Sequence, residues 1–226
     1  MKPVPRLMLI VGRERVRGPL PEFVAAVVDA GVDAVQVREP GLPPEALQAL
    51  AAPLLSAVDG QAALLVNREV AVAAALGVGV HLPERGESPA AARRRLGPAP
   101  LVGRSVHGAP AAAAAAGADY LLAGHLFPTS SHPGQAPLGL PGLRRIVAAA
   151  PCPALAVGGI DADNAAEAIR AGARGVAVIG AIVDAPEPAR AATRLRAAVD
   201  AALAEEGERM EPSGTATERA SIEVVV

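Results

Sequence analysis

The stretch ALAVGGIDADNAAEAIRAGARGVAVIG, residues 154–180, decides the fold of this chain. An apolar run ends at two glycines, an alanine-rich stretch follows, and Ala171-Gly172-Ala173 separates it from a second apolar run. Strands that are apolar almost throughout are typical of a parallel sheet buried on both faces, with helices connecting successive strands. Glycine after the alanine-rich stretch favours the left-handed turn that ends a helix. Residues 154–180 therefore predict a strand–helix–strand unit.

The same unit recurs along the rest of the chain. The expected strands lie at residues 6–11, 34–39, 63–67, 79–82, 101–106, 119–127, 154–160 and 175–182. The expected helices lie at about residues 20–30, 43–57, 69–76, 88–96, 108–116, 140–149, 161–171 and 186–204. Eight such units in 226 residues predict a single (β/α)8 TIM barrel with parallel strands, and an open doubly wound sheet is the alternative.

The pattern changes near the end of the chain. We expect one barrel domain over residues 1–204 and a disordered tail over 205–226, because the tail is rich in charged residues, Ser, Thr, Gly and Pro. The final residues 222–226 are strand-like but have no evident partner.

Composition argues against several classes of function. A net charge of −2, with two Phe, one Tyr and no Trp, gives neither the field nor the rings that bind nucleic acid. No apolar run reaches the roughly 18 residues of a membrane span, and the N-terminus lacks a secretory pattern. The single cysteine, Cys152, fits a reducing compartment. We therefore expect a cytoplasmic protein with a small-molecule partner; the sequence leaves its oligomeric state open, with a homodimer as one option.

Polar residues gather at the expected carboxyl ends of the strands, where TIM barrels carry their chemistry. Gln36 and Arg38 face the same side of the second strand. An arginine there needs either an anionic ligand or a carboxylate neighbour such as Glu39 or Glu69. Asn67 ends the third strand and offers amide donors, although a turn-forming role is an alternative.

Glycines after the seventh and eighth strands predict a phosphate site. Gly158 and Gly159 precede an expected helix start at Asp161, and Gly180 follows the last apolar run. Backbone N–H groups that glycine leaves accessible attract anions, and these two loops hold phosphate in many TIM barrels. Tight turns alone are the alternative explanation.

Histidines follow three of the strands, and His125 is the strongest candidate for proton transfer. A neutral imidazole can accept and return a proton near pH 7. A metal site made of His81, His107 and His125 is an alternative, but their spacing lacks the close pairing of a ligand motif. Residues 128–141 are expected to form a mobile lid, in which Thr129 could donate to phosphate.

Seven motifs, in this order, resemble the thiamine phosphate synthase/thiazole tautomerase family. They are Gln36-Val37-Arg38-Glu39, Leu65-Val66-Asn67, Gly79-Val80-His81-Leu82, Gly103-Arg104-Ser105-Val106-His107, Gly117-Ala118-Asp119-Tyr120, Phe127-Pro128-Thr129 and Val157-Gly158-Gly159-Ile160. The resemblance runs from about residue 6 to 200 and implies a TIM barrel that acts on a thiazole phosphate.

Departures from the family pattern separate its two branches. The synthase joins a pyrimidine diphosphate to the thiazole, with Mg²⁺ held by two aspartates and with lysines on the diphosphate. Here Pro40 and His132 stand where the synthase pattern has lysines, and Arg68 stands where it has an aspartate. Residues 83–86, PERG, replace the run that supplies the second aspartate.

The motif Gly124-His125-Leu126-Phe127 resembles the tautomerase branch, since synthases have proline in place of the histidine. The resemblance therefore predicts an isomerase, a thiazole tautomerase that aromatises a thiazole phosphate carboxylate by a proton shift and needs no metal or cofactor. The implied site comprises His125 as catalytic acid/base, Gln36, Arg38, Asn67, Ser105 and Thr129 for substrate binding, and Gly158, Gly159 and Gly180 for phosphate binding. A thiamine phosphate synthase and a non-catalytic regulator that binds thiazole phosphate or thiamine phosphate are the alternatives.

Overall fold

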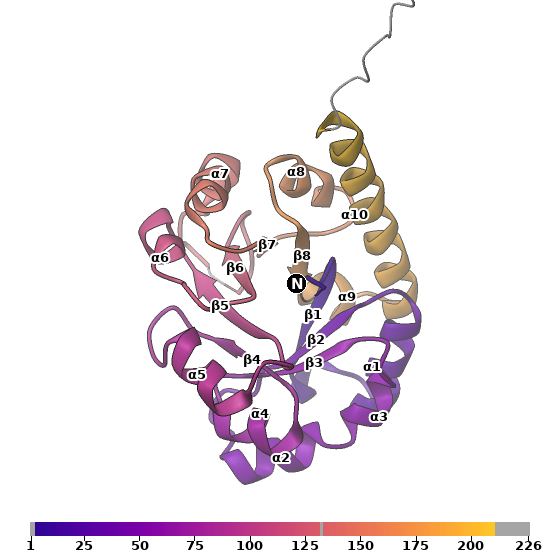
Figure 1. The fold of residues 1–226 in the computed structure, drawn as a ribbon. Helices are drawn as coiled ribbons and strands as arrows, with labels where there is room; N and C mark the ends of the chain where they lie inside the picture. Colours follow the sequence, from indigo (N-terminus) through magenta and orange to yellow (C-terminus); the bar gives the residue numbers. More distant parts are fainter. Residues whose placement is uncertain (1–2, 132, 211–226) are drawn as a thin grey trace, which may run out of the picture.

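Eight parallel strands close into a barrel in the computed structural model, which describes residues 3–131 and 133–210 (Figure 1). Each strand pairs with its neighbours in sequence, and β8 pairs with β1 to close the sheet. The strands are β1 (Leu7–Val11), β2 (Ala34–Val37), β3 (Ala63–Asn67), β4 (Gly79–Leu82), β5 (Val102–Val106), β6 (Tyr120–Gly124), β7 (Ala154–Val157) and β8 (Gly175–Val178). The TIM barrel expected from the sequence is confirmed, and the open sheet is not.

Helices surround the barrel on its outside (Figure 1). They are η1 (Arg13–Arg15), α1 (Leu20–Asp29), α2 (Pro44–Ala51), α3 (Leu54–Val58), α4 (Val70–Leu76), α5 (Pro89–Leu96), α6 (Ala109–Ala113), α7 (Gly139–Ala149), α8 (Ala165–Arg170), α9 (Gly180–Val183) and α10 (Pro188–Met210). None of the helices in the described part of the chain is both long and apolar enough to cross a membrane.

Two layers of apolar side chains hold these elements together. The outer layer lies between the strands and the helices and contains most of the buried Val, Leu and Ala side chains. The inner layer fills the barrel and consists of Met8, Ile10, Ala34, Leu65, Tyr120, Leu122, Leu155 and Ala177. Because side chains alternate along a strand, six of the strands contribute to both layers, which explains their apolar sequences. β4 and β5 contribute only to the outer layer.

Several helix ends follow the expected signals. The Ser88 side chain accepts a hydrogen bond from the Ala91 amide at 3.2 Å and so caps α5. Gly31, Gly117 and Gly172 have φ of 108°, 89° and 100°, the left-handed region that glycine adopts without a Cβ clash. Burial raises the pKa of the Cys152 thiol to about 11, which fits a structural residue better than a nucleophile.

Several expected boundaries were wrong, and the strands expected at 34–39, 119–127 and 154–160 end early, at Val37, Gly124 and Val157. The helix expected at 43–57 is two helices, because Pro53 between α2 and α3 lacks the amide that a continuous helix needs. The strand expected at 175–182 ends at Val178, and α9 follows from Gly180. Helix α10 continues to Met210, past the expected domain boundary at residue 204. The rest of the expected disordered tail lies outside the described residues.

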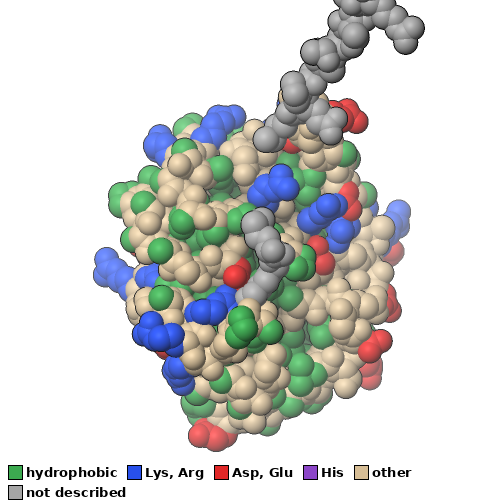
Figure 2. All heavy atoms as spheres, viewed as in Figure 1, with side chains coloured by type: hydrophobic (Ala, Val, Ile, Leu, Met, Phe, Trp, Pro, Cys, Tyr) green, Lys and Arg blue, Asp and Glu red, His purple; other side chains and the backbone are tan. Residues whose placement is uncertain are grey.

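Figure 2 shows one face of the molecule, in the view of Figure 1. Lys/Arg and Asp/Glu side chains both occur across this face, so no single-sign patch dominates it. This distribution agrees with the small net charge of the chain.

Candidate active site

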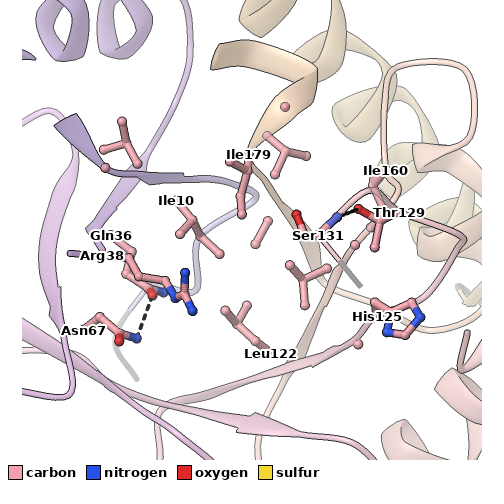
Figure 3. A pocket seen from close by; sticks show the side chains of 18 of the residues that line it. Ile10, Gln36, Arg38, Asn67, Leu122, His125, Thr129, Ser131, Ile160 and Ile179 are labelled. Atoms are coloured by element: carbon pink, nitrogen blue, oxygen red, sulfur yellow. Dashed lines mark hydrogen bonds between the residues drawn. The ribbon is translucent and has the colours of Figure 1, made fainter. Parts of the chain in front are cut away.

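One pocket of about 560 Å³ lies at the carboxyl ends of the strands. Every residue expected in the site lines it: Gln36, Arg38, Asn67, Ser105, His125, Thr129, Gly158, Gly159 and Gly180. Figure 3 shows Gln36, Arg38 and Asn67 on one side, and Thr129, Ser131 and His125 on the other. Apolar side chains, among them Ile10, Leu122 and Ile179, lie between the two sides.

A chain of amides organises the first side. The Asn67 amide donates to the side-chain oxygen of Gln36 at 3.1 Å (Figure 3). The Gln36 amide faces the Met8 sulfur at 3.8 Å. Gln36 is 1% exposed, so the barrel fixes its orientation. These contacts hold both amides at the pocket. The Asn67 backbone carbonyl also accepts the Glu69 amide at 2.9 Å, so the turn-forming role considered for Asn67 occurs as well.

Arg38 is exposed at the pocket mouth, and among the residues that the structure describes it has no ion-pair partner. The Glu39 carboxylate, one of its expected partners, accepts the Arg13 amide at 2.5 Å instead. Its other oxygen lies 4.0 Å from Arg13 Nε. The Arg38 guanidinium therefore faces the pocket without a neutralising carboxylate, as a residue that binds an anion would.

The glycines of the opposite side are required by the backbone itself. Gly158 and Gly159 have φ of 97° and 67°. A Cβ on Gly158 would lie 2.4 Å from the His125 Cβ, and one on Gly159 would lie 2.5 Å from the Pro128 carbonyl oxygen. These contacts account for both glycines without any ligand, so phosphate binding at this loop stays a prediction.

Arg15 is a pocket residue that the sequence reasoning missed. It belongs to η1, directly after β1, and its Nη2 lies 2.5 Å from Asp184 Oδ2. The same Nη2 would be 3.7 Å from a Cβ placed on Gly180. The guanidinium therefore lies beside one of the predicted phosphate glycines. The rule that polar residues after strands gather at one rim, applied to the first strand, would have found it.

His81 lies at the floor of the pocket inside the barrel, 2% exposed. Its Nε2 is 2.8 Å from Ser105 Oγ and its Nδ1 is 3.1 Å from the Tyr120 hydroxyl. Burial lowers the pKa of His81 to about 3, so the ring is neutral at physiological pH. Burial also raises the pKa of Tyr120, whose ring is fully buried.

The other two histidines lie apart from this cluster. His107 Nδ1 is 2.8 Å from the Glu84 carboxylate, which also accepts the His107 amide at 2.7 Å. His125 Nε2 lies 3.4 Å from the Gln135 carbonyl oxygen in the loop after β6. The three-histidine metal site considered from the sequence does not form.

The pocket also lacks the ligands of the Mg²⁺ site that the synthase branch implies. No group of three or more His, Cys, Asp or Glu residues that could hold a metal occurs in the described part of the chain. The carboxylates that line the pocket are Glu14 and Glu39, and the second of these is already bonded to Arg13. The side chains present do not fit a two-aspartate metal centre.

The fold and the pocket define a TIM barrel with a ligand site at the carboxyl ends of its strands. A family model described as Thiamine monophosphate synthase matches residues 7–182. The chain belongs to this family.

Individual relatives agree with the family model. A Thiamine-phosphate synthase of Roseiflexus sp. (strain RS-1) is 39% identical over 191 residues, 82% of this chain and 81% of the relative. The Thiamine biosynthesis bifunctional protein ThiM/ThiE of Symbiobacterium thermophilum is 42% identical over 193 residues, and the chain spans only 40% of that relative. The solved structure of Thiamine phosphate pyrophosphorylase from Pyrococcus furiosus has a TM-score of 0.78 and 33% identity, over 88% of this chain and 96% of that one.

The prediction of a thiazole tautomerase is wrong. Relatives 39% and 41% identical over more than four fifths of this chain are named Thiamine-phosphate synthase, which is a transferase. The prediction gave more weight to a few residues at the rim, mainly His125, than to the similarity over the whole chain. The isomerase activity and the catalytic role of His125 in it are therefore withdrawn.

Proposed function

We propose that this chain is a transferase of the thiamine-phosphate synthase type, which joins a pyrimidine diphosphate to a thiazole phosphate. The observation that carries the proposal is a single pocket with two polar sides in a member of this family. Such a pocket suits two phosphorylated small molecules bound side by side. The similarity to the Roseiflexus relative, which covers 82% of this chain, supports the same reaction class.

The reaction forms one bond and breaks one. The ring nitrogen of the thiazole bonds to the methylene carbon of the pyrimidine, and the bond from that carbon to the diphosphate oxygen breaks. The electron pair leaves with the diphosphate, and no proton has to move. Negative charge therefore builds on the leaving group, and positive groups placed there lower the barrier.

Arg38 is the residue that we assign to the diphosphate, because its guanidinium faces the pocket without a carboxylate partner in the described structure. The amides of Gln36 and Asn67 lie on the same side and provide further polar contacts. On the other side, the amides of Gly158 and Gly159 and the hydroxyl of Thr129 are the groups assigned to the thiazole phosphate.

The test is a reaction of the full chain with pyrimidine diphosphate, thiazole phosphate and Mg²⁺. We expect thiamine phosphate and inorganic diphosphate in equal amounts, measured by chromatography and a coupled diphosphate assay. Arg38→Ala should lower the rate by about tenfold or more, as loss of one charged hydrogen bond to a diphosphate predicts. Arg190→Ala, at an exposed position on α10, is the matched control.

Binding of both substrates without product would overturn the transferase proposal. That result would favour a non-catalytic binding protein, with which the missing metal ligands and lysines are consistent. Product in the presence of EDTA would instead show that the reaction proceeds without a metal ion.

A further inference from the structure

A fully buried tyrosine lies beneath the pocket and is the only tyrosine of the chain. Tyr120 pairs in register with Gly103 on the neighbouring strand. A Cβ on Gly103 would lie 2.1 Å from Tyr120 Cζ, so glycine is what makes room for the ring inside the barrel. The ring can then lie against His81, with centroids 5.7 Å apart.

The Tyr120 hydroxyl has one hydrogen-bond partner among the described residues, the His81 Nδ1 at 3.1 Å. The hydroxyl hydrogen needs an acceptor, because a buried donor without one costs free energy. His81 Nδ1 is the only acceptor within reach in the described structure. The Tyr120 hydroxyl therefore donates to His81, and Nδ1 carries no proton.

This direction fixes the tautomer of the imidazole. The ring is neutral, because burial lowers the pKa of His81 to about 3, and its one proton must be on Nε2. The Nε2–H group then donates to Ser105 Oγ at 2.8 Å. The hydrogen of the Ser105 hydroxyl is left to point elsewhere, and Ser105 lines the pocket.

The reverse direction is less favourable. If Ser105 donated to His81, Nδ1–H would donate to Tyr120, and the phenol hydrogen would be buried with no acceptor among the described residues. In the forward direction, the unpaired hydrogen lies at the pocket, where water or a ligand can accept it. Desolvation therefore selects one orientation of the whole chain of hydrogen bonds.

We propose that Tyr120 and His81 are positioning residues that turn the Ser105 hydroxyl into a donor aimed at a phosphoryl oxygen of the bound ligand. The ligand class rests on the proposed function, whereas the direction of the hydrogen bonds does not. Both the phosphate of the thiazole and the diphosphate of the pyrimidine offer this chemistry. Inorganic phosphate and inorganic diphosphate serve as separate probes.

The first test reads the tautomer directly. Long-range ¹H–¹⁵N spectra of the ligand-free protein should show His81 protonated on Nε2, with the signal assigned by its loss in His81→Gln. Tyr120→Phe keeps the ring but removes the phenol donor, so the His81 Nδ1 resonance should shift because it loses its hydrogen bond. An Nδ1-protonated ring in the unaltered protein overturns the proposal, whatever the reaction of the enzyme.

The second test measures binding of inorganic diphosphate and inorganic phosphate by calorimetry. Ser105→Ala should weaken the Kd of one probe by about tenfold, and Ser105→Thr, which keeps the hydroxyl, should restore most of it. Tyr120→Phe should weaken the same probe by a smaller factor. Ser56→Ala, on the exposed side of α3, is the matched control and should bind as the unaltered protein does.

Equal affinity of Ser105→Ala and the unaltered protein for both probes overturns the role of Ser105. Should Ser105→Ala fail to fold, the tautomer of the unaltered protein and the binding by Tyr120→Phe decide the question. Absence of thiamine phosphate in the enzyme assay, with the Nε2 tautomer and the loss of probe binding observed, would refute the transferase and leave this inference standing.

Discussion

The Arg15 guanidinium and the Asp184 carboxylate form an ion pair beside the predicted phosphate loop, with Nη2 and Oδ2 2.5 Å apart. Arg15 follows β1 and Asp184 follows α9, so the pair joins the two ends of the barrel sequence at one rim. Both side chains are well exposed, at 41% and 57%. A pair of this kind contributes at most about 1 kcal/mol to folding, so its main effect is to hold the guanidinium in place.

Arg15→Ala should therefore change binding more than stability. We expect the Kd for inorganic phosphate, measured by calorimetry, to rise by about fivefold to tenfold, because one charged hydrogen bond to the anion is lost. The urea midpoint should shift little, as for a surface pair. Asp184→Asn keeps the arginine but removes its anchor, and a smaller loss is expected. An unchanged Kd in Arg15→Ala would remove Arg15 from the site.

Two glycines of the chain should respond to alanine with opposite signs. Gly158 has φ of 97° and a Cβ there would meet His125, so Gly158→Ala should destabilise the fold by at least about 1–2 kcal/mol. Gly207 lies in α10 with no atom within 4 Å of a Cβ placed there, and alanine should stabilise that helix by about 0.5–1 kcal/mol. Urea unfolding monitored by circular dichroism measures both. Equal effects would contradict the strained geometry of Gly158.

The strands were predictable because their apolar runs are long and regular, and β3 and β4 have the bounds expected from the sequence. The pocket followed from them, since a parallel barrel brings all carboxyl strand ends to one rim. Contacts between strands were not predictable in the same way. The His81–Tyr120 pair depends on the register of three neighbouring strands, which no local pattern encodes.

Function was harder to predict than fold. Loss of metal carboxylates and lysines at the rim was taken to disfavour the transferase, which was kept as an alternative, and one histidine was taken to indicate the tautomerase. Such rim residues vary while the barrel that carries them stays the same, because loops tolerate substitution better than buried strands. His132, at the position of one missing lysine, lies outside the described residues.

The ligand-free protein should bind Mg²⁺ poorly. Glu39 is bonded to Arg13, Glu84 is bonded to His107, and the described residues hold no cluster of metal donors. Mg²⁺ favours octahedral sites with carboxylate ligands, which this pocket does not supply. Titration of the ligand-free chain with Mg²⁺ should therefore give no saturable heat below millimolar concentration. The same titration after addition of inorganic diphosphate is the control, because the diphosphate oxygens are themselves ligands. Tight binding to the ligand-free chain would reveal a site that the described residues do not contain.

The buried His81 should make the fold sensitive to mild acid. The pKa of His81 is about 3 in the folded protein, against 6.5 for a free imidazole. Between these values the imidazole is protonated in the unfolded chain and neutral in the folded protein. The contribution of the neutral His81 to the free energy of unfolding is fully present above pH 6.5 and is lost as the pH falls toward 3, with a slope of up to about 1.4 kcal/mol per pH unit. His81→Gln carries no titrating ring, so it takes up about one proton fewer on unfolding. Between pH 6.5 and 5, where few carboxylates titrate, its free energy of unfolding should therefore change less steeply with pH than that of the unaltered protein. Urea unfolding at several pH values measures both slopes, and His107→Gln, which removes an exposed ring, is the control. Parallel slopes for His81→Gln and the unaltered protein would mean that the imidazole is protonated in the fold. Nδ1–H would then donate to the Tyr120 hydroxyl, whereas Nε2–H would still donate to Ser105.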